Sequence, residues 1–163
     1  ALRGGHGRNG GGRMSRPTLA AAAAALLLAS GPLFAGALPQ VEVFKSPYCG
    51  CCGAWVDHMK AAGFQVKVTE VADTSAARRR LALPDALASC HSAKLAHYAL
   101  EGHVPAAEVR RLLATQAPAI GLAVPGMPAS APGMDVPGQN DPYQVLLIDK
   151  QAKSRVFATY PQR

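Results

Sequence analysis

A cluster of three cysteines at the start of a predicted helix constrains the fold of this chain more than any other feature. Residues Gln40–Lys45 alternate apolar and polar side chains, which predicts a short strand. The turn Ser46-Pro47-Tyr48 is followed by Cys49-Gly50-Cys51-Cys52 and by a helical pattern that runs to Ala62. The dipole and the unpaired amide groups of a helix N-terminus stabilise a thiolate. Such a thiolate can act as a redox nucleophile or as a soft metal ligand.

The order of the remaining elements predicts the fold class. After the cysteine cluster, strands and helices alternate, and the pattern from Ala93 to Leu100 fits either a strand or a short helix. This order predicts an α/β, thioredoxin-like fold with a central mixed sheet, helices on both faces and the cysteines at the first strand-to-helix turn. In such folds a proline that precedes a strand faces the cysteine pair, and Pro125 is the candidate. The predicted elements are strand 40–45, a helix to residue 62, strand 65–71, helix 74–83, a helix from 105, strand 119–124, loop 125–142, strand 144–149 and edge strand 155–160.

The N-terminal part of the chain has the layout of a secretory signal. Arg16 supplies a positive charge, Leu19–Ala29 is an apolar run of 11 residues, and Ala35-Gly36-Ala37 matches an A-x-A cleavage site. A buried alanine-rich helix and a retained membrane anchor are the alternatives.

This layout divides the chain into three parts. Residues 1–13 are rich in Gly and Arg and are predicted to be an upstream, non-native extension before Met14. Residues 14–37 are the predicted signal peptide, and residues 38–163 are the predicted thioredoxin-like metal-binding domain. The alanine-rich leader favours a bacterial periplasm as the location. No apolar run reaches the roughly 18 residues that span a bilayer, so we expect no stable membrane insertion after cleavage.

The net charge of +7 does not predict a nucleic-acid partner. The leader holds four of the 17 Lys and Arg residues and no acid, which leaves a net charge of +3 on residues 38–163. The cluster Arg78-Arg79-Arg80 lies in a predicted helix without interleaved aromatic residues, so we interpret it as a solvated helix face.

All four cysteines lie in the predicted exported domain, where free thiols tend to become oxidised or bound to metal. Cys51 stands inside the C-x-x-C pair of Cys49 and Cys52, and Cys90 is followed by His91. Two structural disulfides are one interpretation, with Cys49–Cys52 and Cys51–Cys90 preferred because bridging adjacent cysteines is strained. A thiol–disulfide oxidoreductase, with Cys49 as nucleophile and Cys52 as resolving thiol, is a second. Metal binding is the third.

Further soft or borderline donors favour copper among the metals. Met127 and Met134 occur in a repeated Pro-Gly-Met within the proline-rich loop, and His103 precedes a predicted helix. Thiolate and thioether ligands together favour Cu(I) over harder ions, and neighbouring thiolates can bridge more than one ion. Zinc is the competitor, because four cysteines or three cysteines and a histidine also suit it.

Three segments of the chain resemble the CopG-type family of periplasmic copper-resistance proteins, long catalogued as a domain of unknown function. The segments are SPYCGCCGAWVDHMKAAGF, SCHSAKLAHYALEGHVP and GLAVPGMPASAPGM, and the resemblance covers nearly all of residues 40–160. Ser92 stands where the family commonly has threonine. The resemblance implies a thioredoxin-like fold, export and copper binding through Cys49, Cys51, Cys52 and Cys90.

Together these observations predict a periplasmic copper-binding protein that acts in copper resistance or homeostasis. A Cu(I)–thiolate site of one or more ions would use the four cysteines, with His91, His103, Met127 and Met134 as second-tier candidates. Interconversion of copper oxidation states is an extension. No sequence feature demands turnover, so we assign no catalytic residue. Expected partners are copper ions and other periplasmic copper-handling proteins.

Overall fold

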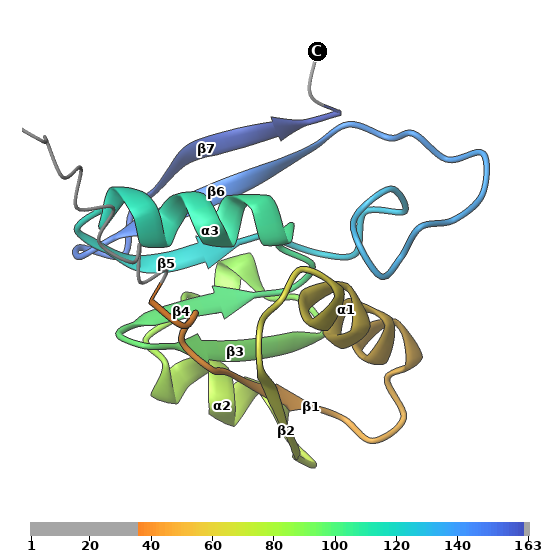
Figure 1. Ribbon diagram of the computed structural model, residues 1–163, viewed down its shortest axis with the longest axis horizontal. Coiled ribbons are helices and arrows are strands. Elements are labelled where there is room, and N and C mark those ends of the chain that lie inside the picture. Colours follow the sequence, from red (N-terminus) through yellow and green to blue (C-terminus); the bar gives the residue numbers. More distant parts are fainter. Residues whose placement is uncertain (1–35, 162–163) are drawn as a thin grey trace, which may run out of the picture. The chain divides into compact units, whose positions relative to one another are not determined.

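A seven-stranded mixed sheet carries three helices in the computed structural model, which describes residues 36–161 (Figure 1). The predicted extension and almost all of the predicted signal peptide lie outside these residues. The elements are β1 Val41–Lys45, α1 Gly50–Ala61, β2 Val66–Glu70, α2 Thr74–Arg80, the 3₁₀ turn η1 Asp85–Leu87, β3 His91–Leu95, β4 Tyr98–Glu101, α3 Ala106–Thr115, β5 Ala119–Ala123, β6 Tyr143–Asp149 and β7 Ser154–Tyr160.

The strands lie in the order β2-β1-β3-β4-β5-β6-β7. The pairs β1/β2 and β4/β5 are parallel, and the other neighbouring pairs are antiparallel. The segment that fitted either a strand or a helix contributes to the β3–β4 hairpin, whose turn residue Ala96 has a φ of 52°. Pairing of β3 with β1 and of β4 with β5 decides its conformation, because both strands are interior in the sheet.

Apolar side chains cover both faces of the sheet. Trp55 of α1 and Leu112 of α3 belong to the larger core cluster, together with Leu100 of β4. Leu83, which follows α2, packs in a smaller cluster with Ala99, the residue that precedes Leu100 in β4. Because successive strand residues point to opposite faces, α1 and α3 lie on one face, and the segment after α2 lies on the other. This arrangement agrees with the predicted helices on both faces of a mixed sheet.

The ends of the helices follow from local sequence. Asp73 caps α2 by accepting a hydrogen bond from the Ser75 amide at 2.8 Å. Gly63 follows α1 with a φ of 90°, a conformation that glycine adopts without a Cβ clash. Helix α2 ends at Arg80, earlier than the predicted residue 83, and Ala82 beyond it has a φ of 58°.

Candidate metal centre

The first strand-to-helix turn places three cysteines at the N-terminus of α1. Cys49 is the N-cap residue, and its sulfur forms a disulfide bond with Cys52. Cys51 is a free thiol, and its Sγ lies 3.6 Å from Cys49 Sγ. One of the two disulfides considered from the sequence is therefore present. The other is absent, because Cys51 and Cys90 are both free.

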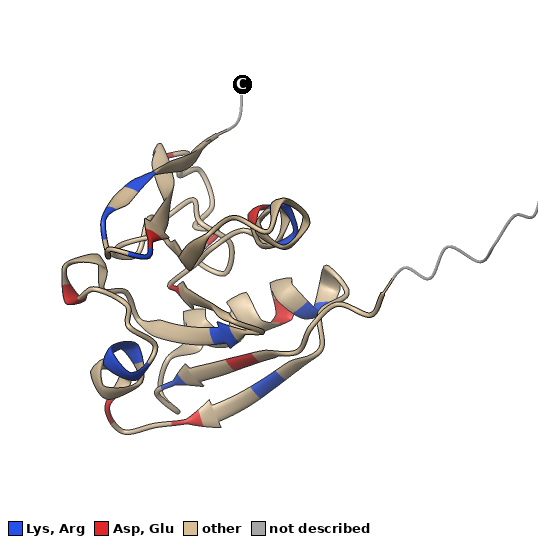
Figure 2. Ribbon diagram, turned by 90° about the vertical axis from the view of Figure 1, so that its left-hand side faces the viewer, with Lys and Arg blue, Asp and Glu red and all other residues tan. Residues whose placement is uncertain are grey.

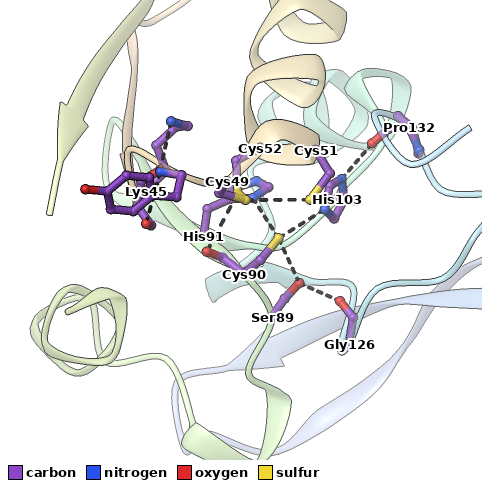
Figure 3. The surroundings of a disulfide bond; sticks show 12 residues. Lys45, Cys49, Cys51, Cys52, Ser89, Cys90, His91, His103, Gly126 and Pro132 are labelled. Carbon is purple, nitrogen blue, oxygen red and sulfur yellow. Dashed lines mark hydrogen bonds between the residues drawn. A yellow bond between two sulfur atoms is a disulfide. The ribbon is translucent and has the colours of Figure 1, made fainter. Parts of the chain in front are cut away.

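The sheet brings the fourth cysteine to this turn. Strand β3 pairs antiparallel with β1 so that His91 lies opposite Lys45, the last residue before the turn. Cys90, 38 residues after Cys52 in the chain, therefore faces the helix N-terminus, and its carbonyl oxygen lies 3.8 Å from Cys52 Sγ. All four sulfur atoms lie within 4.8 Å of one another (Figure 3).

Cys90 occupies the position for which Pro125 was the candidate. It directly precedes β3 and faces the Cys49–Cys52 pair, whereas Pro125 lies beyond the end of β5. Among the described residues, the cis peptide bond precedes Pro161. The prediction for Pro125 is therefore wrong, because it follows a strand.

Two histidines adjoin the Cys90 thiol (Figure 3). Cys90 Sγ lies 3.1 Å from His103 Nε2 and 3.4 Å from His91 Nδ1. On its other side, His103 Nδ1 lies 2.8 Å from the carbonyl oxygen of Pro132. Because a carbonyl only accepts, Nδ1 carries the proton and Nε2 presents its lone pair to Cys90. The donor atoms of Cys90, His91 and His103 form a second group within 4.8 Å.

Burial sets the protonation of these groups. It lowers the pKa of His91 to about 3, with the neighbouring His103 acting in the same direction. Burial also lowers the pKa of His103, so both imidazoles are neutral at pH 7 and can donate a lone pair. Burial, together with the Cys51 sulfur, raises the pKa of Cys90 to about 11 in the metal-free protein. Metal binding at Cys90 would therefore release a proton.

The donor set fits a soft or borderline metal ion. Sulfur and imidazole nitrogen are the ligands that copper and zinc prefer over oxygen. His91 is fully buried, and its Nε2 has no hydrogen-bond partner among the described residues. The His91 ring packs 4.5 Å from the ring of Trp55, whose Nε1 donates to Val104 O at 2.9 Å. The buried tryptophan shields this side of the centre from water.

The proline-rich loop contacts the centre through its backbone, and its two methionines differ in exposure. Met127 is 57% exposed, whereas Met134 packs against the main core. Between them, Pro132 holds His103 and Gly133 packs against the backbone of Trp55.

A buried charged network beneath Cys90 did not emerge from the sequence. Glu101 is fully buried and accepts hydrogen bonds from Arg78, Ser89 and Ser92. The expectation of a solvated face is therefore wrong for Arg78, which is 6% exposed, although Arg79 and Arg80 are exposed. The available signal was an acidic residue ending the otherwise apolar segment Tyr98–Glu101.

Charges elsewhere are distributed over the molecule. Basic and acidic positions are interspersed over the described residues, in blue and red in Figure 2, although α2 ends in three consecutive arginines. Among residues 36–161, no helix is long and apolar enough to cross a membrane.

Comparison with known proteins places the chain beside copper-resistance proteins. Residues 87–134 match a family model described as a protein of unknown function, DUF411. Two solved structures described as copper resistance protein copG, forms 2 and 1, share 39% and 38% identity with the chain. They cover 76% and 77% of this chain and 99% of their own chains, each with a TM-score of 0.72. No curated protein sequence matches the chain significantly.

Proposed function

Since this chain belongs to the CopG-type family of copper-resistance proteins, we propose that it binds Cu(I) in the periplasm through a thiolate site. The ligands are Cys49, Cys51, Cys52 and Cys90, with imidazole nitrogens of His91 and His103 completing the donor set. The observation that carries this proposal is the convergence of four sulfur atoms within 4.8 Å of one another. Three of them come from the N-cap and the first turn of α1, and the fourth comes from the residue that precedes β3.

The proposed fold is thioredoxin-like. Support comes from the order β1-α1-β2-α2-β3-β4-α3 and from the sheet order β2-β1-β3-β4, which places the cysteine turn at the end of a central strand. The amide groups and the dipole of the α1 N-terminus would stabilise thiolate charge at Cys51 and Cys52. The helix N-terminus would thereby favour the deprotonated cysteines that Cu(I) binds.

Loading of the full site requires reduction of the Cys49–Cys52 disulfide. The bond accepts two electrons and two protons from a dithiol reductant, which becomes a disulfide in turn. Before reduction, Cys51 and Cys90 supply the thiols, and the two histidines supply nitrogen. As an extension, two Cu(II) ions could each take one electron from the Cys49 and Cys52 thiols, which would yield two Cu(I) ions, two protons and the disulfide.

The ligand types support Cu(I) over zinc. Cu(I) is the softer ion and tolerates thiolate bridges between ions, and close sulfur atoms favour such bridges. Met127, exposed on the proline-rich loop, adds a thioether that could accept Cu(I) from a periplasmic copper-handling protein. Met134 is a second-tier ligand that would have to leave its contacts with the core.

The test is copper binding by the protein after anaerobic reduction. We expect Cys90→Ser to reduce both the copper bound per protein and the affinity measured against a Cu(I) chelator. The reason is that Cys90 belongs to both clusters of possible ligands, the four cysteines and the set of Cys90, His91 and His103. Cys90 also has no neighbouring cysteine in sequence to replace it. Ser154→Ala is the control, since it alters an exposed serine on β7, at the far edge of the sheet, and leaves every sulfur in place.

Unchanged copper stoichiometry in Cys90→Ser would remove Cys90 from the site and contradict the proposal. Tighter binding of zinc than of Cu(I) by the wild-type protein would contradict the metal assignment.

A thiol–disulfide oxidoreductase is the second candidate function. The disulfide between Cys49 and Cys52 at the N-terminus of α1 favours it. The same Cys90→Ser protein separates the two functions, because disulfide exchange at Cys49 and Cys52 survives the substitution whereas full copper binding does not. Reduction of a model disulfide substrate by the metal-free variant at the wild-type rate would support the oxidoreductase.

A further inference from the structure

A buried carboxylate lies beneath the segment that carries Cys90. Glu101, the last residue of β4, is fully buried. Its Oε1 accepts hydrogen bonds from the Ser89 amide at 2.7 Å and from Arg78 Nε at 3.0 Å. Its Oε2 accepts one from the Ser92 hydroxyl at 2.5 Å. The carboxylate is thus held by three donors on three segments of the chain.

Arg78 also binds the backbone of Ser89. Its Nη2 donates to the carbonyl oxygen of Ser89 at 3.2 Å, and its Nη1 lies 3.4 Å from Asp85 Oδ1. The amide of Ser89 is therefore bound by Glu101 and the carbonyl by Arg78. We call this pair, Glu101 and Arg78, the Ser89 clamp.

Stability alone is a weak explanation for the Ser89 clamp. The desolvation of a buried ion pair commonly cancels much of its attraction, and apolar residues of the same volume often serve as well. A charged pair can do what an apolar pair cannot: its fixed donors and acceptors hold the peptide groups of one residue in one orientation.

The residue held in this way directly precedes a proposed metal ligand. With the backbone of Ser89 fixed, the Cys90 side chain has its sulfur 3.1 Å from His103 Nε2. The Ser89 hydroxyl adds a hydrogen bond to Gly126 O at 2.5 Å, which ties the segment to the proline-rich loop (Figure 3). Gly102, next to Glu101, has a φ of 71°, and a Cβ there would lie 2.5 Å from Ser89 Oγ. The packing around Ser89 therefore leaves the segment little freedom.

We propose that Glu101 and Arg78 are positioning residues that hold Cys90 in the metal centre through the backbone of Ser89. The inference rests on the proposed function for its consequence, since partners that orient metal ligands tune affinity. The restraint of the Cys90 sulfur is a property of the metal-free protein and does not depend on the proposed function.

The experiment measures the restraint in metal-free, oxidised protein. In a Cys51→Ser background the Cys49–Cys52 disulfide leaves Cys90 as the single free thiol. We expect Glu101→Gln in this background to raise the rate of Cys90 alkylation by iodoacetamide about tenfold at fixed pH. Loss of the carboxylate charge weakens the hydrogen bonds that hold Ser89, so the thiol reaches solvent more often.

Glu108→Gln in the same background is the matched control. Glu108 is also a buried carboxylate, 3% exposed, which accepts a hydrogen bond from Tyr160 and pairs with Arg111 at 2.9 Å. Glu108→Gln makes the same change of charge on α3, away from Ser89, so this substitution should leave the alkylation rate within about twofold of the background. An unchanged rate in Glu101→Gln, or an equal rise in Glu108→Gln, overturns the inference.

A second variant covers the case in which Glu101→Gln does not fold. Ser92→Ala removes only the hydroxyl that donates to Glu101 Oε2, and we expect a smaller rise in the alkylation rate, about threefold. No rise in this folded variant also overturns the inference.

The copper readout is separate from the alkylation readout. In the protein with all four cysteines, reduced and loaded with Cu(I), Glu101→Gln should lose copper to a chelator about tenfold more readily than Glu108→Gln. Failure of the wild-type protein to bind copper would contradict the proposed function, while the alkylation rates would still decide the role of the Ser89 clamp.

Discussion

At the scale of single residues, the proposed metal site depends on which nitrogen of His103 carries the proton. The Pro132 carbonyl takes the Nδ1 proton, which turns the Nε2 lone pair toward Cys90. Burial lowers the pKa of His103 and so keeps the ring neutral at pH 7. A backbone carbonyl 29 residues away in the chain therefore selects the tautomer whose free Nε2 faces Cys90.

His103→Gln tests the imidazole directly. We expect the affinity of the reduced protein for Cu(I) to fall at least about tenfold, because an amide is a poor substitute for imidazole nitrogen. Chelator competition measures the affinity. His97→Gln is the control, since His97 is exposed and its ring lies tilted against that of Tyr98. Equal Cu(I) affinities in the two variants would show that His103 is not a ligand and only binds the proline-rich loop.

At the scale of elements, the proline-rich loop lies against the N-terminus of α1 at one glycine. Gly133 has a φ of 86°, and a Cβ there would lie 2.6 Å from the Trp55 amide nitrogen. The residue before it supplies the carbonyl that orients His103. Close packing of the loop on the helix is thereby coupled to the geometry of the centre.

Gly133→Ala should disturb both stability and copper binding. Gly138→Ala is its matched control, because Gly138 also has a positive φ, 77°, but nothing within 4 Å of its Cβ position. Each alanine carries the left-handed backbone penalty of about 1 kcal/mol. Only Gly133→Ala adds overpacking, for a further loss of about 1–3 kcal/mol in the free energy of unfolding. Urea denaturation measures the difference, and equal losses in the two variants would contradict the packing argument.

At the scale of the whole molecule, three buried or half-buried histidines make the metal-free protein sensitive to acid. Burial lowers the pKa values of His58, His91 and His103 below their ordinary value, that of His91 to about 3. The unfolded chain takes up protons near pH 6.5, and the folded chain does so only at lower pH. Between these limits the unfolded state binds more protons, so stability falls as the pH falls.

We expect the free energy of unfolding of the metal-free protein to decrease from about pH 6.5 toward pH 3. For His91 alone the slope approaches about 1.4 kcal/mol per pH unit. Denaturant titrations at several pH values measure it. His58→Gln should reduce the slope, because its amide oxygen can still accept the Ala106 amide hydrogen bond, 3.0 Å in the wild type, without titrating. The exposed His97 offers the control His97→Asn, and an identical slope in all three proteins would contradict the linkage.

The elements were largely predictable from local patterns. Alternation predicts β1 and β2, and the largely apolar segments 119–124 and 144–149 predict β5 and β6. The N-cap residue Asp73 and the glycine Gly63 predict helix ends within a few residues. The hairpin β3–β4 was ambiguous, because the pattern of residues 93–100 fits either a strand or a short helix. Pairing with β1 and β5 resolves it, and that pairing is a property of the sheet.

The sequence by itself determined the chemical character of the candidate centre: three cysteines at a helix N-terminus, a fourth beside a histidine, and a family resemblance borne out by the copG structures. Only the tertiary structure decided that Cys49 bonds to Cys52, that Cys90 takes the place considered for Pro125, and that Arg78 is buried against Glu101. Periodicity and capping depend on neighbours within one turn or strand. Contacts between distant residues depend on strand register and on which polar groups find partners once water is excluded.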